Sequence, residues 1–204
     1  MRDIETVLFD LGGVLVDWDP RHLYRKIFDD PAEMEKFLNE VCHPHWNFLH
    51  DKGALSFANS IPDLQHRYPH YHDEIAAWQD RWPEMMKSAI ERTVGILEDL
   101  KTREKVRLFA LTNWSAETWP HALERFEFLN HFEGILVSGQ EKLAKPDPRI
   151  FDLVCERFKL NPRKTLFIDD SEKNIQQARE MGFHTHWFRD PVKLQRELIE
   201  ERLF

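Results

Sequence analysis

Short apolar runs alternate with helical patterns along most of this chain, and this alternation restricts the fold more than any other feature. Five runs indicate strands: residues 7–9, 106–111, 135–137, 166–168 and 183–188. Most are continuously apolar, which is typical of strands covered on both faces. Helical patterns occupy the intervals between and after the later runs: 90–100, 150–158, 174–181 and 191–199. The alternation predicts an α/β fold with a parallel, doubly wound sheet and right-handed crossovers.

One interval, from residue 17 to residue 92, has no strand pattern. It contains helical segments after Asp19-Pro20 and after Asp30-Pro31, and two more over 55–64 and 72–90. Such a stretch is too long for a single crossover between neighbouring strands. We therefore predict a Rossmann-like core, residues 1–16 and 93–204, with an inserted helical cap, residues 17–92. Trp78 and Trp82 have helical spacing and are expected in the core of the cap.

Polar side chains follow three of the predicted strands. Asp10 follows the first, Thr112-Asn113 the second, and Asp169-Asp170 the run at 166–168, while Lys145 comes shortly after the run at 135–137. The carboxyl ends of parallel strands share one edge of the sheet, where ligands bind. Carboxylates suit a nucleophile and a hard divalent cation, and lysine, hydroxyl and amide donors suit phosphate oxygens. We expect phosphoryl transfer at this edge.

The segments FDLGGVLVD, LTN, KPDP and FIDDSEKN carry a resemblance. In this order and spacing they resemble the four motifs of the haloacid dehalogenase superfamily, and the insertion resembles its small helical cap. The resemblance implies that Asp10 is the nucleophile and that Mg²⁺ binds Asp10, the Gly12 carbonyl and Asp170, with Asp169 as a further residue of the metal site that lies close by or acts through water. It also implies that Thr112 and Asn113 hold phosphate and that Lys145 pairs with phosphate and nucleophile.

One position departs from the pattern of the superfamily's phosphatases. They usually carry a second aspartate two residues after the nucleophile as general acid and base, and here that residue is Gly12. Asp17 and Asp19 are possible substitutes. A phosphatase subgroup of the superfamily has the same DLG run, which favours a Mg²⁺-dependent phosphatase working through an aspartyl-phosphate. The alternatives are a 2-haloacid dehalogenase forming an ester at Asp10 and a non-catalytic ligand-binding protein of the same fold. The paired Asp169-Asp170 counts against the dehalogenase.

Histidines gather in the segment CHPHWNFLHDKG. Together with Cys42, the residues His43, His45 and His50 resemble part of a zinc site. Their spacing is irregular, however, and the sequence has no second pair of cysteine or histidine ligands to complete such a site. The favoured interpretation is a cap loop that faces the active site. In that case Trp46, Asn47 or Asp51 contacts the leaving group of the substrate.

Charge and cysteine content limit the partners. The formal net charge is −8, which argues against nucleic acid or an anionic membrane as a default partner. Two isolated cysteines and the absence of a signal-peptide or membrane-span pattern predict a cytoplasmic protein. The expected substrate is a small phosphomonoester, such as a sugar phosphate. Neither the particular substrate nor the oligomeric state can be read from the sequence.

Overall fold

Residues 3–204 are described by the computed structural model, in which a five-stranded parallel sheet forms the centre. The strand order is β5-β4-β1-β6-β7. The strands are β1 (Thr6–Phe9), β4 (Arg107–Thr112), β5 (Gly134–Val137), β6 (Thr165–Asp169) and β7 (His184–Trp187). All five predicted strands and the doubly wound α/β architecture are confirmed.

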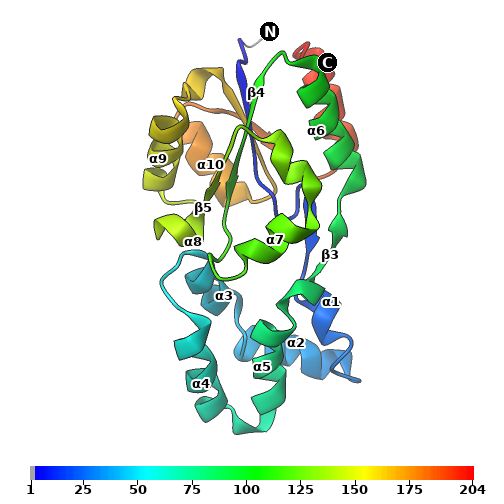
Figure 1. The fold of residues 1–204 in the computed structure, drawn as a ribbon, viewed down its shortest axis with the longest axis vertical. Helices are drawn as coiled ribbons and strands as arrows, with labels where there is room; N and C mark the ends of the chain where they lie inside the picture. Colours follow the sequence, from blue (N-terminus) through cyan, green and yellow to red (C-terminus); the bar gives the residue numbers. More distant parts are fainter. Residues whose placement is uncertain (1–2) are drawn as a thin grey trace.

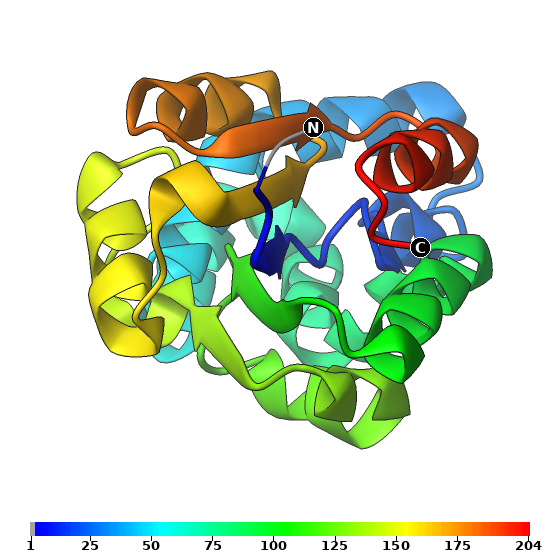
Figure 2. The same ribbon diagram turned by 90° about the horizontal axis from the view of Figure 1, so that it is seen from above.

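Both faces of the sheet are covered by helices, which explains the continuous apolar runs. Along β1, Val7 and Phe9 face one hydrophobic core and Leu8 faces the other. Helices α6 (Glu91–Arg103) and α11 (Pro191–Glu200) cover the first face, and α9 (Pro148–Phe158) and α10 (Glu172–Glu180) cover the second (Figure 2).

Helix boundaries follow local sequence signals. The carboxylate of Asp190 accepts a hydrogen bond from the Lys193 backbone N–H at 3.0 Å, and Pro191 opens α11. These are an N-cap and the favoured first residue of a helix. Helix α10 ends just before Gly182, whose φ of 88° is the left-handed conformation that glycine adopts freely.

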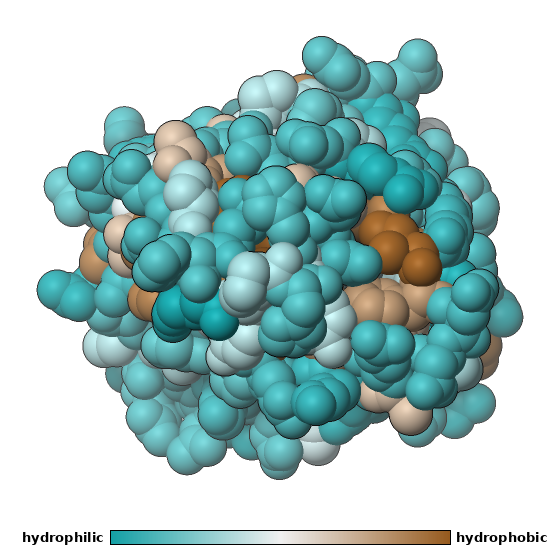
Figure 3. Space-filling view, turned by 90° about the horizontal axis from the view of Figure 1, so that it is seen from below, coloured by the Kyte–Doolittle hydropathy of each residue, from teal (hydrophilic) through white to brown (hydrophobic). Residues whose placement is uncertain are grey.

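A group of helices packs at one end of the molecule (Figure 1). They are α1 (Arg21–Tyr24), α2 (Pro31–Glu40), α3 (Pro44–Asp51), α4 (Phe57–Arg67) and α5 (His72–Asp80). Tyr24, Phe37 and Trp78 are fully or almost fully buried and pack against one another at ring-centroid distances of 4.9 Å and 5.9 Å from Tyr24. Seen from this end, the surface is mostly hydrophilic (Figure 3). Trp78 lies in the core of the cap, as expected, whereas Trp82 is buried beside Trp114 of the core and lines a cavity.

Three expectations about the insertion are wrong. A two-stranded antiparallel ribbon, β2 (Val16–Trp18) with β3 (Met86–Ala89), joins it to the core, although no strand was expected there. The helix predicted over 72–90 ends at Asp80 and is followed by a 3₁₀ turn over Trp82–Met85. The segment expected as a loop is helix α3, because His43 caps its first turn and Pro44 opens it.

The topology places β1 at the centre of the sheet, with β4 on one side and β6 on the other. The chain winds outward from β1 in both directions, so the carboxyl end of β1 is the switch point where ligands bind in such sheets. The ribbon of β2 and β3 leads from this edge into α1–α5, which places the helical insertion over it (Figure 1). No helix of the described residues is long and apolar enough to span a bilayer.

Candidate active site

Asp10 lies immediately after β1, at the switch point. Its backbone N–H continues the ladder by donating to the Ile168 carbonyl at 2.8 Å. Its carboxylate Oδ1 accepts the Leu11 N–H at 2.7 Å and lies 2.9 Å from Lys145 Nζ. Both donors hold Oδ1, while Oδ2 has no hydrogen-bond donor among the residues that the structure describes. The second oxygen is therefore available for chemistry.

Lys145 links two carboxylates from below the site. Its ammonium also donates to Asp169 Oδ2 at 2.7 Å and to the Leu111 carbonyl at 2.8 Å, and its side chain is 0% exposed. Burial disfavours the charged form, but Asp10 and Asp169 outweigh that cost and raise the pKa of Lys145. Lys145 is thus a permanent cation that orients Asp10 and reduces the repulsion between the two acids.

The carboxylate oxygens of Asp169 are hydrogen-bonded to several donors of the protein. Besides Lys145, Asp169 accepts the Ser171 N–H at 2.8 Å and both of its oxygens lie 3.0 Å from Asn174 Nδ2. A carboxylate with this many donors is a fixed anchor for Lys145 rather than an open metal ligand. Asn174 was not predicted as a site residue. The available signal was its place in the first turn of the helix that follows β6, where a side chain can reach back to the strand end.

Asp10, Asp169 and Asp170 form the one group of at least three acidic, histidine or cysteine side chains in residues 3–204 that could share a metal ion. One oxygen of each lies within 4.8 Å of the others. Burial raises the pKa of Asp10 well above its usual range; Lys145 opposes this rise, and Asp169 and Asp170 add to it. Clustered carboxylates of this kind are costly unless a cation lies between them. The donor set fits a hard divalent cation such as Mg²⁺.

The turn after Asp10 adds a backbone ligand. Its hydrogen bonds run to the carbonyls of Leu11 and Val16, and none uses the Gly12 carbonyl. That oxygen is therefore free to face a cation. The next residue, Gly13, has a φ of 72°, and a Cβ there would overlap the Asp170 carboxylate. Glycine at position 13 therefore allows Asp170 to approach the turn.

A cavity of about 340 Å³ opens above Asp10. The acids Asp10 and Asp170 lie on the core side together with the Gly12–Gly13 turn and Asn113, and three indoles and one further acid complete its lining. These last four residues are Trp18, Trp82, Trp114 and Asp51. The indole of Trp82 packs near both others, with ring centroids 6.5 Å from Trp18 and 5.6 Å from Trp114. Much of the lining is therefore aromatic.

Thr112 and Asn113 occupy the end of β4, as expected. The Thr112 hydroxyl is buried and has no hydrogen-bond partner in the described residues, so it is a donor in need of an acceptor such as a phosphate oxygen. The Asn113 amide instead makes two bonds of 2.9 Å with the backbone of Lys145. Its side chain is thus engaged in positioning Lys145, and Asn113 also lines the cavity.

Two predicted site residues lie elsewhere. Asp17 does not line the cavity, and its Oδ1 pairs with His22 Nε2 at 2.9 Å. Trp46 is 8% exposed and packs edge-on against Trp78 inside the helical cap, with centroids 5.3 Å apart. A helix in place of the expected loop turns Trp46 inward. Of the three residues suggested from this segment, Asp51 is the one that reaches the cavity.

The histidine-rich segment has structural contacts. His43 caps α3 by accepting the His45 N–H at 3.0 Å, and the buried His50 is 2.9 Å from the Ser60 hydroxyl. Burial raises the pKa of the Cys42 thiol. These residues form no metal-binding group in residues 3–204. The zinc alternative finds no support in this geometry.

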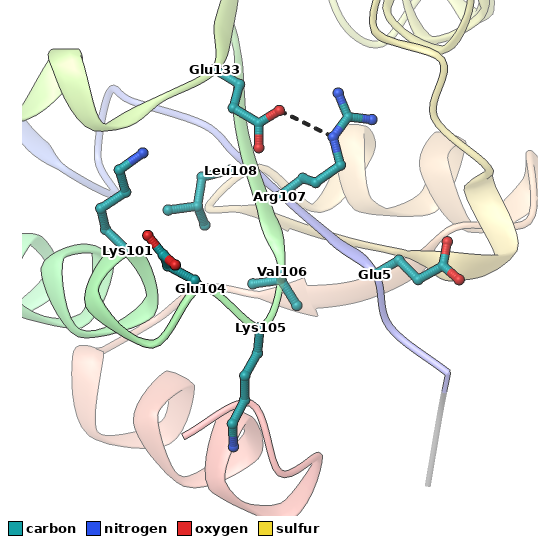
Figure 4. Close-up of a pocket in the computed structure, with 8 residues that line it drawn as sticks. All are labelled: Glu5, Lys101, Glu104, Lys105, Val106, Arg107, Leu108 and Glu133. Atoms are coloured by element: carbon teal, nitrogen blue, oxygen red, sulfur yellow. Dashed lines mark hydrogen bonds and ion pairs between the residues drawn. The ribbon is translucent and has the colours of Figure 1, made fainter.

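A second cavity, of about 500 Å³, lies at the opposite edge of the sheet (Figure 4). Three acids and three bases line it, and the bases are already engaged in part. Arg107 pairs with Glu133 at 3.1 Å, and Lys105 donates to the Arg202 and Phe204 carbonyls at 3.1 Å and 3.2 Å. The acids and bases of this cavity balance in number, and it does not lie at the carboxyl ends of the strands. We therefore do not regard it as a candidate active site.

Comparison with known proteins places these features in a family. The model of the haloacid dehalogenase-like hydrolases matches residues 4–182. The chain is 22% identical over 183 residues to a phosphorylated carbohydrates phosphatase of Thermotoga maritima, covering 88% of this chain and 82% of that one. It is 27% identical over 194 residues to a D-ribitol-5-phosphate phosphatase of Bacteroides thetaiotaomicron, covering 89% and 90%.

Solved structures agree with the sequence comparison. A haloacid dehalogenase family enzyme of Bacteroides thetaiotaomicron, crystallised with magnesium and inorganic phosphate, superposes with a TM-score of 0.68 at 28% identity, covering 94% of this chain and 98% of that one. A dehalogenase captured with an intermediate has the same fold, with a TM-score of 0.68 at 21% identity over 91% and 84% of the two chains.

Proposed function

Because the chain belongs to the haloacid dehalogenase-like hydrolases, we propose that it is a Mg²⁺-dependent phosphatase that hydrolyses a small phosphorylated metabolite through Asp10. The observation that carries this proposal is the cluster of Asp10, Asp169 and Asp170 around the buried ammonium of Lys145. A dehalogenase expels halide and has no need of a cation at the nucleophile. Three converging carboxylates with one lysine do need one.

The proposed reaction uses the groups in two steps. Asp10 Oδ2 attacks phosphorus, the bond to the substrate oxygen breaks, and an aspartyl-phosphate forms; water then attacks phosphorus and releases Asp10. Lys145 holds Oδ1 and so points Oδ2 at the phosphoryl group. The Thr112 hydroxyl donates to a phosphate oxygen. Asp10, the Gly12 carbonyl and Asp170 would hold Mg²⁺, which would neutralise charge on the transferring oxygens.

The substrate class that we propose is a sugar or polyol phosphate. Trp18, Trp82 and Trp114 present apolar faces suited to the carbon skeleton of such a molecule, and Asp51 supplies a polar group among them. The two curated relatives named above act on phosphorylated carbohydrates and on D-ribitol-5-phosphate. A cavity of about 340 Å³ has room for a small metabolite of this kind.

One panel assay tests the proposal. Ribitol-5-phosphate, hexose phosphates and p-nitrophenyl phosphate are offered with Mg²⁺ or with excess EDTA, and chloroacetate serves as the substrate of the rival reaction. We expect phosphate release with Mg²⁺ only, and no chloride. Asp10→Asn should reduce turnover to background, whereas Asp152→Asn, an exposed carboxylate of α9, should leave it unchanged. Chloride release in EDTA would support a dehalogenase. Binding without turnover in the wild type would support the non-catalytic alternative.

A further inference from the structure

The reaction just proposed lacks a proton donor in the core. An alkyl phosphate expels an alkoxide, and the acyl phosphate must be cleaved by an activated water, so each step gains from a general acid or base. Gly12 carries no side chain, and Asp17, which pairs with His22, is not among the residues that line the cavity. Some other titratable group must serve if turnover of alkyl phosphates is fast.

Three titratable side chains line the cavity in the part of the chain that the structure describes: Asp10, Asp170 and Asp51. The first two belong to the nucleophile and the cation site. Asp51 comes from the last turn of α3 in the insertion, whereas Asp10 and Asp170 follow strands of the core. When a phosphate rests against Asp10, a carboxyl that enters the same cavity from the insertion is placed to reach the leaving group.

Asp51 is held firmly in that place. Asn47, one helical turn earlier, donates to Asp51 Oδ2 at 2.9 Å. The Asp51 backbone carbonyl accepts a hydrogen bond from the Ser138 hydroxyl, which in turn accepts the Trp114 N–H at 2.9 Å. Through these two hydrogen bonds, Asp51 at the end of α3 is linked to Ser138 and Trp114 of the core. A catalytic group needs this kind of fixed orientation.

The surroundings of Asp51 keep it protonated. Burial raises its pKa to about 8, although hydrogen bonds from the Ser115 backbone and the Asn47 amide act in the opposite direction. The charged groups that share the cavity with it in the described chain are Asp10 and Asp170, both acidic. Lys145, the nearest base of the site, lies on the far side of Asp10 and is not part of the lining. A neutral carboxyl near pH 7 can give up a proton and then take one back.

We propose that Asp51 is the general acid and base of this enzyme and replaces, from the cap, the carboxylate that Gly12 does not supply. The inference rests on the proposed phosphatase function. As Asp10 attacks phosphorus, the phosphorus–oxygen bond of the ester breaks and the Asp51 proton passes to the departing oxygen, giving a neutral alcohol. In the second step the Asp51 carboxylate takes a proton from the attacking water as the bond between phosphorus and Asp10 breaks. Phosphate leaves, and Asp51 is protonated again.

The test compares leaving groups in Asp51→Asn, which keeps the shape of the side chain. Turnover of ribitol-5-phosphate should fall by about 10²–10⁴-fold, the usual contribution of a general acid. With p-nitrophenyl phosphate the first step needs little help, but the second still lacks its base. We therefore expect a burst of p-nitrophenolate close to one equivalent of enzyme, followed by slow release, where the wild type shows no burst. Asp51→Glu should restore part of the turnover.

Asp73→Asn is the matched control, since Asp73 is a cap carboxylate whose side chain is 99% exposed. It should behave as the wild type with both substrates. If Asp51→Asn slows the alkyl and the aryl ester by the same factor and gives no burst, Asp51 only positions the substrate and the inference is overturned while the phosphatase function stands. If the wild type releases no phosphate from any ester, the proposed function fails and the inference falls with it.

Discussion

The backbone conformation at position 12 does not require a glycine. The φ of Gly12 lies outside the left-handed region, and a Cβ built on it would meet nothing within 4 Å. The neighbouring Gly13 is different, because its φ is 72° and a side chain there would overlap Asp170. The missing carboxylate at position 12 is therefore a chemical property of this chain and not a consequence of the turn.

The open space at Gly12 allows a rescue experiment. In the Asp51→Asn background, Gly12→Asp should raise turnover of ribitol-5-phosphate at least about tenfold, because a positioned carboxyl again supplies the proton. Gly12→Ala adds the same Cβ without an acid and should rescue nothing. The measurement is kcat for phosphate release with saturating Mg²⁺. Equal turnover in the alanine and aspartate variants would contradict this account.

The raised pKa of Asp51 has a consequence for stability. A carboxyl with a pKa of about 8 in the folded protein and an ordinary value of about 3.9 when unfolded keeps a proton that the unfolded chain releases. The contribution of Asp51 to folding stability therefore falls as pH rises from about 4 to about 8 and is constant outside that window. Asp51→Asn removes this loss, since asparagine does not titrate.

Thermal unfolding in EDTA checks this expectation. The melting temperature of Asp51→Asn should match that of the wild type near pH 4 and exceed it increasingly up to pH 8. Asp73→Asn provides the control for the loss of a cap carboxylate whose side chain is 99% exposed. A variant that is less stable than the wild type at pH 8 would mean that Asp51 is charged in the folded protein, which would contradict its role as an acid.

At the scale of elements, the junction between α3 and the core is closely packed. Gly53, just after α3, has a φ of 71° and lies against the Gly139 backbone, where a Cβ would overlap the Gly139 carbonyl. Gly139 belongs to the short helix α8 (Ser138–Glu141) and lies equally close to the Trp114–Ala116 backbone. The backbone after α3 therefore lies directly against the backbone of α8, which places Asp51 close to the core.

Gly139→Ala should disturb this junction. Its Cβ would lie within 3.0 Å of backbone atoms that cannot rotate away, and overpacking of this kind typically costs about 1–3 kcal/mol. Gly95→Ala is the control, because Gly95 lies inside α6 with free space around it and should gain about 0.5–1 kcal/mol. Urea unfolding measures both, and kcat/KM should fall only in Gly139→Ala. If both variants lose stability, the free space around each glycine does not determine the change in the free energy of unfolding, and this account is wrong.

Prediction from sequence succeeded for elements with a clear apolar pattern and failed where that pattern is interrupted. Strands buried on both faces, such as β1 and β6, give continuous apolar runs that need no context. The ribbon of β2 and β3 was missed because most of its residues are exposed or partly exposed, which leaves no apolar run to detect. Helix α3 was missed because its apolar residues are interspersed with two histidines and an asparagine.

Among the site residues, too, some could be placed from the sequence and others could not. Residues placed by a strand end, such as Asp10, Thr112 and Asp169, lie where the sequence put them, because the sheet topology dictates their positions. Residues of the insertion depend on which side of a short helix faces the core, and this cannot be read without the packing partners. For that reason Trp46 was expected at the cavity and lies in the cap core, while the roles of Asn174 and the three indoles became visible only in the structure.

At the scale of the molecule, the helical cap and the core share one hydrophobic cluster. Tyr24 and Trp78 of the cap belong to the same set of buried contacts as Phe9 of β1 and Leu97 of α6. The active-site cavity lies between the two parts, with Asp10 below it and Asp51 above it. The formal net charge of −8 repels an anionic substrate. Local cationic charge must overcome that repulsion, and Lys145 alone is already paired with two carboxylates.

A divalent cation should therefore affect the whole fold and not only the reaction. Ligand that binds the native state stabilises it by about 2.7 kcal/mol at 100 times Kd. For a chain of this length, that corresponds to a rise in melting temperature of roughly 5–10 °C. Mg²⁺ should produce this rise in the wild type and in Asp152→Asn, whereas Asp170→Asn, which removes a ligand, should lose most of it. NaCl at matched ionic strength controls for screening of the net charge. A rise of the same size with NaCl, or in Asp170→Asn, would mean that the carboxylate cluster holds no specific cation.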